Sequence, residues 1–133
     1  MNPKHVITII LRSNGSVLIL KRSRKAGTYG GKWESVGGDV EGASSLMLAT
    51  RKIREETGLQ GGEVKFLKAG REFEVKDRQQ RTAWIVHPFL FEAFFPKNVR
   101  VAGGHSEFKW IKPADLELFE TVPGLDQAMS HVL

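Results

Sequence analysis

The sequence predicts one α/β domain in which short β-strands surround a central helix and two helical segments close the chain. Three observations carry this prediction. The 133 residues suffice for one compact core and are too few for two ordinary domains, so a single domain is expected over residues 1–133. Most apolar runs are short and β-rich, with glycine-containing turns between them. No repeat, low-complexity tract or linker divides them.

The first elements are a hairpin and a short strand. Residues 5–11 and 16–21 are rich in aliphatic and β-branched residues, and the intervening Asn14-Gly15 is a strong signal for a tight hairpin turn. Residues 32–36 form the next predicted strand. It runs into Gly37-Gly38, a pair that can adopt backbone angles closed to other residues. We therefore expect a sharp turn after this strand.

A single helix is predicted in the middle of the chain. Ser44 or Ser45 can cap its first turn, the helix continues to about Thr57, and Gly58 is placed to end it in a left-handed conformation. Apolar residues recur along this segment at helical spacing and are expected to pack against the core. These residues are Leu46, Ala49 and Ile53.

The second half of the chain is predicted to complete the sheet and end in helices. Residues 63–75 and 82–95 are long β-rich stretches, and residues 108–111 form a last short strand. A proline opens each of the two following segments, as suits a first helical turn. We expect a helical turn over residues 113–118 and a final helix over residues 123–132.

Composition restricts the class of protein. The chain is 41% hydrophobic and 26% charged, a mixture typical of globular proteins. No apolar run approaches the roughly 18 residues needed to span a bilayer, and the apolar residues 6–11 lack the length and cleavage site of a signal peptide. We therefore expect a cytoplasmic protein without a membrane partner. Cysteine is absent, which excludes disulfides, thiolate metal sites and a cysteine nucleophile.

The charge balance favours phosphate-bearing partners. Twenty Lys and Arg residues against fifteen Asp and Glu residues give a net charge of +5, which attracts anions at long range. Aromatic residues near the main basic cluster are limited to Tyr29 and Trp33, so we interpret the cluster as a solvated loop and expect no nucleic-acid partner. The cluster consists of Lys21, Arg22, Arg24, Lys25 and Lys32.

Residues 37–59 carry the most specific motif: a double glycine, a predicted helix and a Glu-Glu-x-Gly ending. In this segment the chain resembles the Nudix (MutT-like) hydrolase family, whose sequence box ends in an arginine-led helix with that Glu-Glu-x-Gly sequence. The hairpin that ends in Leu-Lys-Arg, the tryptophan before the double glycine and the late Glu-x-x-Trp sequence also resemble the family. The matching box positions are Gly37, Gly38, Glu41, Arg51, Ile53, Glu55, Glu56, Gly58 and Leu59.

The resemblance implies a fold and an activity. The fold is an α/β/α sandwich around a mixed β-sheet, and the activity is metal-dependent pyrophosphohydrolysis of a nucleoside diphosphate linked to another moiety. The cofactor would be Mg²⁺ or Mn²⁺, and a homodimer is one expected arrangement. We expect the catalytic residues to be Glu55, Glu56, Arg51 and Glu107, the metal ligands to be Glu55, Glu56 and Glu41, and the substrate-binding residues to be Arg22, Gly37 and Gly38.

The first departure from the family pattern is a missing carboxylate. Counting back from Arg51 places Ala43 where the box has its first Glu, and counting from Gly38 places Ser44 there. Neither alignment restores the carboxylate. Glu41 is close enough in sequence to replace it if the loop is rearranged.

The second departure is Lys52, which stands where the Arg-Glu pair of the family supplies a metal ligand or general base. Lys52, Glu55 and Glu56 are spaced i, i+3 and i+4, so they share a helix face. An ammonium beside these two carboxylates weakens cation binding and removes a base.

Two functions remain open. The first is a pyrophosphohydrolase of reduced activity. The second is a catalytically silent module that binds a nucleotide or diphosphate ligand, for which Lys52 is the main support. Glu107 is read equally well as an added ligand and as a surface residue. His105 is interpreted as an exposed loop residue and His87 as a core or interface residue.

Overall fold

The computed structural model describes residues 3–40 and 45–133. The expected metal ligand Glu41 and the two positions of the first departure, Ala43 and Ser44, lie outside these residues. The strands are β1 (Pro3–Ser13), β2 (Ser16–Arg22), β3 (Trp33–Glu34), β4 (Val36–Asp39), β5 (Val64–Ala69), β6 (Phe73–Asp77), β7 (Thr82–Ala93) and β8 (His105–Ile111). The helices are α1 (Ser45–Thr57) and α2 (Leu125–Val132), with 3₁₀ segments η1 (Gly61–Glu63), η2 (Pro96–Asn98) and η3 (Pro113–Leu118).

The strands form one mixed sheet organised around β1. Strand β1 runs parallel to β7 along most of its length, from Pro3 beside Ala83 to Arg12 beside Glu92. On its other edge, the first half of β1 pairs antiparallel with β4, whereas its end pairs with β2 through the hairpin. Strand β2 also pairs with β3 and β8, and β7 also pairs with β5 and β6. The predicted mixed sheet is therefore confirmed.

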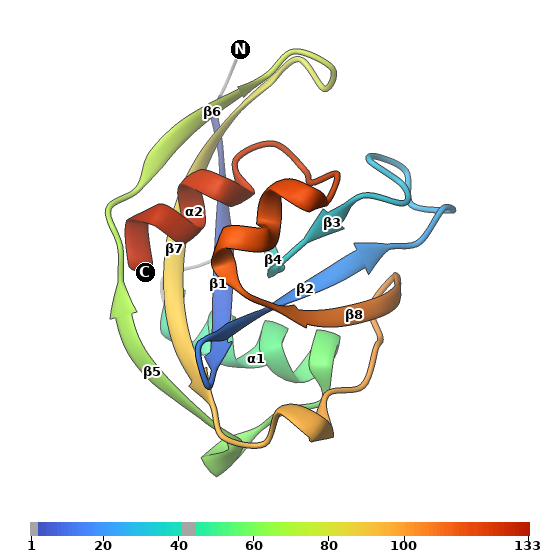
Figure 1. The fold of residues 1–133 in the computed structure, drawn as a ribbon. Helices are drawn as coiled ribbons and strands as arrows, with labels where there is room; N and C mark the ends of the chain where they lie inside the picture. Colours follow the sequence, from blue (N-terminus) through green and yellow to red (C-terminus); the bar gives the residue numbers. More distant parts are fainter. Residues whose placement is uncertain (1–2, 41–44) are drawn as a thin grey trace.

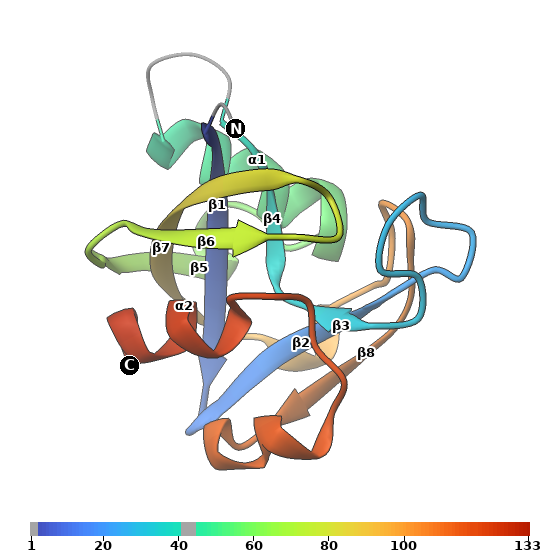
Figure 2. The ribbon, with the colours of Figure 1, turned by 90° about the horizontal axis from the view of Figure 1, so that it is seen from above.

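The two helices cover opposite faces of this sheet, as the two views show (Figures 1 and 2). Alternate residues of a strand point to opposite faces. Ile7 and Ile9 of β1 accordingly belong to one buried cluster with Ile53 of α1, whereas Ile10 belongs to a second cluster with Met129 of α2. The arrangement is the α/β/α sandwich implied by the resemblance.

Two of the three core residues predicted for helix α1 are buried in the structure. Ala49 and Ile53 are fully buried, but Leu46 is 45% exposed, so its prediction as a core residue is wrong. Leu46 lies in the first turn, where it faces a surface groove that it shares with Phe66, and Leu48 of the same turn is buried instead. The buried arc of the helix is therefore wider than a single stripe.

The buried arc of α1 also includes a carboxylate. Glu56 follows Ala49 by seven residues, which is close to two full turns at 3.6 residues per turn, so both side chains leave the helix in nearly the same direction. The sequence predicted that Glu55 and Glu56 share one helix face. The structure separates them, because Glu56 is 8% exposed and faces the sheet, whereas the Glu55 side chain is 45% exposed.

Local turn signals were the most reliable part of the sequence prediction. Asn14 and Gly15 both have positive φ, as a tight hairpin requires, and Gly58 has φ of 79° where α1 ends. The predicted strand over residues 63–75 is instead divided at Gly70, whose N–H donates to the Pro88 carbonyl (2.8 Å). No helix within residues 3–40 and 45–133 is long and apolar enough to cross a bilayer.

Candidate active site

A cavity of about 450 Å³ opens between β4, the segment after β2, the β6–β7 hairpin and the residues before α2. This volume suits a ligand of nucleotide size. Two groups of polar and aromatic side chains line it. We call Arg22, Glu34, Glu56 and His105 the carboxylate cluster, and Tyr29, Asp77, Gln80 and Trp84 the aromatic cluster.

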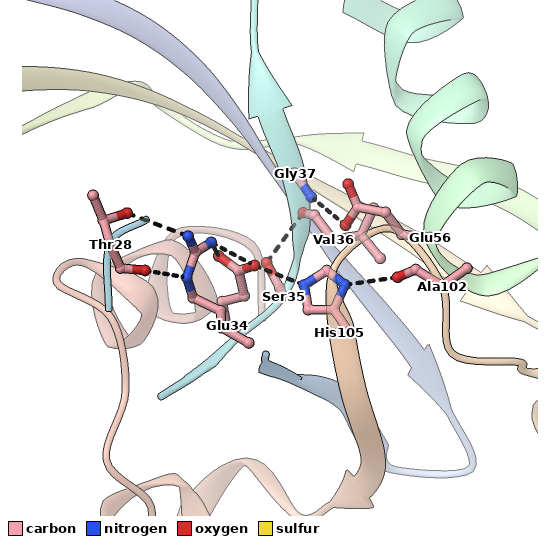
Figure 3. Close-up of polar contacts among 9 residues, drawn as sticks. Thr28, Glu34, Ser35, Val36, Gly37, Glu56, Ala102 and His105 are labelled. Atoms are coloured by element: carbon pink, nitrogen blue, oxygen red, sulfur yellow. Dashed lines mark hydrogen bonds and ion pairs between the residues drawn. The ribbon is translucent and has the colours of Figure 1, made fainter. Parts of the chain in front are cut away.

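Glu34 of β3 lies at the centre of the carboxylate cluster (Figure 3). The Arg22 Nη1 donates to both of its oxygens, at 3.2 and 3.1 Å, and the His105 Nε2 lies 2.7 Å from Oε2. The remaining donors of Arg22 bind Thr28, through Nε to its carbonyl (2.8 Å) and Nη2 to its hydroxyl (3.2 Å). Arg22 therefore fixes the loop after β2 and orients Glu34, in addition to lining the pocket where we expected it to contact substrate.

His105 is a buried histidine that lines the pocket between two acceptors. It begins β8 and its side chain is only 4% exposed, contrary to the exposed loop position expected from the sequence. Burial lowers its pKa, but hydrogen bonds to Glu34 and to the Ala102 carbonyl outweigh burial, so the pKa is raised above its ordinary value. Both ring nitrogens face acceptors, at 2.7 and 3.0 Å, an arrangement that the doubly protonated imidazolium satisfies.

Glu56 brings a buried carboxylate from α1 to β4 (Figure 3). The Gly37 N–H donates to its Oε1 at 3.4 Å. A side chain at Gly103 would begin 3.2 Å from the Glu56 Cγ, so the glycine leaves room for the carboxylate. Burial is the largest influence on the pKa of Glu56 and raises it, the nearby positive charge of His105 lowers it, and the Glu34 carboxylate raises it, so that the pKa is raised to about 7. Near neutral pH this carboxylate can both accept and return a proton.

Lys52 lies against Gly38, the second residue of the double glycine. A Cβ on Gly38 would fall 2.7 Å from the Lys52 Cε and 3.1 Å from its Nζ, so the lysine tip rests over the glycine backbone. The lysine charge lowers the pKa of Glu56, although its contribution is the smallest of those acting on this group. The expected direct pairing with Glu55 and Glu56 is absent, since Lys52 forms no ion pair among the described residues.

The other predicted site residues lie outside the cavity lining. Arg51 pairs with Glu55 on the exposed side of α1, with Nε 3.5 Å from Oε1 and side chains 53% and 45% exposed. Glu107 pairs with Lys21 across β8 and β2 at 3.7 Å. The cavity thus brings together Arg22, Gly37, Gly38 and Glu56, and leaves Arg51, Glu55 and Glu107 elsewhere.

The described residues do not fit a divalent metal ion. Residues 3–40 and 45–133 contain no group of three or more His, Asp or Glu side chains placed to hold one. Glu56 has the Lys52 ammonium near it, and Glu55 is paired with Arg51 on the outer side of the helix. A cation at Glu56 would therefore meet the repelling positive charge of Lys52.

Asp77 anchors the aromatic cluster and was not identified from the sequence. It is 4% exposed and accepts hydrogen bonds from the Tyr29 hydroxyl (2.7 Å), the Trp84 indole N–H (3.3 Å) and the Gln80 backbone N–H (3.0 Å). Burial raises the pKa of Asp77, but these hydrogen bonds outweigh it and hold the pKa below its ordinary value. Burial and the Asp77 carboxylate raise the pKa of Tyr29 to about 12. The indole of Trp84 is thereby held in one orientation at the cavity wall.

Comparisons with known proteins agree on one family. A family model described as NUDIX domain matches residues 1–132. A nucleoside triphosphatase, NudI, from Salmonella newport is 23% identical over 139 residues, which cover 100% of this chain and 96% of the relative. The crystal structure of a Nudix hydrolase from M. smegmatis, RenU, has a TM-score of 0.77 at 19% identity and covers 98% of this chain and 84% of its own. The NUDIX domain of Shewanella oneidensis NrtR, solved with ADP ribose, has a TM-score of 0.68 at 17% identity and covers 98% and 86%.

Proposed function

The chain belongs to the NUDIX domain family, and from this premise we propose that it hydrolyses a phosphoanhydride bond in a nucleoside diphosphate linked to another moiety. One observation carries the proposal. A single cavity joins the buried Glu56 carboxylate to an oriented indole at Trp84. The nucleobase stacks on Trp84, and the diphosphate lies along Gly37 and Gly38 beside Glu56.

The chemistry is an attack of water on phosphorus. Glu56 takes a proton from the water as its oxygen bonds to a phosphorus atom, and the anhydride P–O bond on the opposite side of that phosphorus breaks. Each product then carries one phosphate end of the former diphosphate. The imidazolium of His105 stabilises the negative charge that develops, and Glu34 holds that imidazolium in place. Arg22 orients Glu34 and so acts as a positioning residue.

No step is assigned to a metal ion. The family resemblance implies Mg²⁺ or Mn²⁺ at Glu55, Glu56 and Glu41, but the described residues do not fit such an ion and Glu41 lies outside them. The proposed hydrolysis uses only side chains that line the cavity. Turnover is therefore to be measured with Mg²⁺, with Mn²⁺ and without either ion.

Lys52 favours a second candidate, a silent module that binds a nucleotide or diphosphate without turnover. Lys52 stands at the box position where the family has a carboxylate, and its tip faces Gly38, which lines the cavity. In this candidate the cavity and its aromatic cluster keep their binding role. The candidates differ in turnover and agree in binding.

The test is a substrate panel with product analysis. Nucleoside triphosphates and ADP-ribose are chosen because the Salmonella relative is named a nucleoside triphosphatase and the Shewanella domain was solved with ADP ribose. Products are separated by chromatography in Mg²⁺, in Mn²⁺ and in a chelator. We expect Glu56→Gln to lose roughly 100-fold or more in kcat with little change in KM, whereas the exposed β6 control Glu74→Gln changes neither.

Two results would reject the hydrolase. The first is binding of a panel member by the parent with no products under any metal condition, which supports the silent module. The second is a Glu56→Gln variant that turns over as fast as the parent, which removes the proposed base.

A further inference from the structure

Lys52 lies beside β4 at the edge of the cavity, against Gly38, and is not itself part of the cavity lining. The lysine reaches from α1 across to Gly38, and its last two atoms lie 2.7 and 3.1 Å from where a Cβ of that residue would be. Gly38 lines the cavity and pairs with Ile7 of β1, so its backbone is fixed by the sheet. The absence of a side chain at Gly38 is what lets the ammonium approach this wall.

The two basic side chains of the carboxylate cluster already have an acidic partner. Arg22 and His105 both bind Glu34, with closest approaches of 3.1 and 2.7 Å. Lys52 forms no ion pair within the part of the chain that the structure describes. An anion that enters along Gly37 and Gly38 would therefore meet Lys52 as the nearby cation with no committed partner among those residues.

We infer that the Lys52 ammonium, in place of a divalent metal ion, supplies the positive charge that binds the diphosphate beside β4. This inference rests on the proposed function, which supplies the class of ligand, a diphosphate. An ammonium is a compact charge with three N–H donors and binds phosphate oxygens directly. The same charge repels a cation from Glu56. Metal-independent binding of the diphosphate follows.

The test measures binding of two probes, ADP and inorganic pyrophosphate, by titration calorimetry in a chelator and in Mg²⁺. The parent should bind both probes in the chelator, with affinity that Mg²⁺ improves less than about 3-fold. Lys52→Met should weaken both by roughly 10-fold or more, because a charge-assisted hydrogen bond is lost, and Lys52→Arg should recover part of the loss. The matched control is Lys97→Met, which removes the same charge from an exposed position on η2.

Gly38→Ala provides a second readout that a general loss of structure would not give. Its new methyl group would displace the flexible lysine tip. When Lys52 is present, the substitution should therefore weaken pyrophosphate binding. In a Lys52→Met background it should have little further effect. This non-additivity links the glycine to the lysine.

The outcomes separate this inference from the proposed function. Binding that needs Mg²⁺, or a Lys52→Met loss no larger than that of Lys97→Met, overturns the inference and leaves hydrolysis intact. Lysine-dependent pyrophosphate binding in the chelator, without turnover of any nucleotide, supports the inference and rejects hydrolysis. Failure of the folded parent to bind either probe under any condition overturns both.

Discussion

Glu56 illustrates how a helical position determines the chemistry of one side chain. Ala49 and Ile53 face the sheet, and Glu56 continues the same buried arc, so its carboxylate loses most of its water. One long hydrogen bond from the Gly37 N–H, at 3.4 Å, compensates only weakly. The charged form is therefore costly in the folded protein, and the pKa rises to about 7.

The raised pKa of Glu56 predicts that stability falls as pH rises. Below its unfolded pKa of 4.5 the group is protonated in both states and carries no penalty. Between 4.5 and about 7 the unfolded chain releases the proton and the folded chain keeps it, so the free energy of unfolding decreases. The total decrease is roughly 3 kcal/mol. Urea titrations from pH 4 to 8 should show this decrease in the parent and a much smaller one in Glu56→Gln, and parallel curves would contradict the assignment.

Lys52→Glu should convert the same wall into a cation site. The substitution changes the local charge by two units beside Gly38 and Glu56, and the resulting carboxylates repel one another unless a cation binds. Without metal the variant should melt below the parent. Added Mg²⁺ should raise its melting temperature more than that of the parent or of Lys97→Glu. An equal Mg²⁺ response in parent and variant would show that Lys52 is not part of the site.

At the scale of single residues, the sequence identified site residues that belong to the box motif but not the residues that contact them. The box motif identified Glu56 and Lys52, because both lie in one helix with a recognisable spacing. It could not identify Glu34, whose partners Arg22 and His105 come from β2 and β8. A glutamate in a two-residue strand carries no periodic signal, and its role depends on side chains brought together only by folding.

At the scale of elements, the cavity depends on a loop tied to a distant hairpin. Tyr29 lies in the segment between β2 and β3 and donates to Asp77 at the end of β6, 48 residues further along the chain. Its backbone has φ of 51°, which a tyrosine rarely adopts without support. The hydrogen bond therefore holds the loop in a conformation that the loop does not favour by itself.

Tyr29→Phe should loosen this loop without unfolding the domain. Loss of one hydrogen bond costs about 1 kcal/mol, and Asp77 keeps its bonds from Gln80 and Trp84. Hydrogen exchange over residues 23–32 should accelerate, and ADP affinity should fall by several-fold. Unchanged exchange in that segment would show that other contacts hold it.

Prediction of the elements succeeded where the signals were local. The hairpin turn at Asn14-Gly15 and the end of α1 at Gly58 depend on neighbouring residues and were confirmed. The parallel pairing of β1 with β7 joins strands about 80 residues apart, and no short motif encodes its register. The break at Gly70 was missed for the same reason. A Cβ there would lie 2.6 Å from the His131 carbonyl, so the position depends on α2.

On the scale of the whole molecule, the sheet separates two hydrophobic cores, and only one of them contains residues of the helix that carries Glu56 and Lys52. The core beneath α1 supports Glu56 and Lys52 through the helix that carries them. The core beneath α2 packs against the opposite face and meets the cavity at Leu125, without carrying Glu56 or Lys52. A substitution that leaves a cavity in the first core should therefore weaken ligand binding. A substitution of equal cost in the second core should lower stability with less effect on binding.

Ile53 and Ile10 offer a matched pair for this expectation, because both are 0% exposed and they belong to opposite cores. Replacing either by alanine should cost about 2–5 kcal/mol of unfolding free energy. ADP affinity should fall clearly in Ile53→Ala, since Glu56 follows one turn later on the same buried face, and little in Ile10→Ala. Titration calorimetry at a temperature where both variants remain folded makes the comparison, with Ile→Val variants if alanine is too disruptive. Equal losses of affinity would show that the site depends on the stability of the whole sheet and not on the seating of α1.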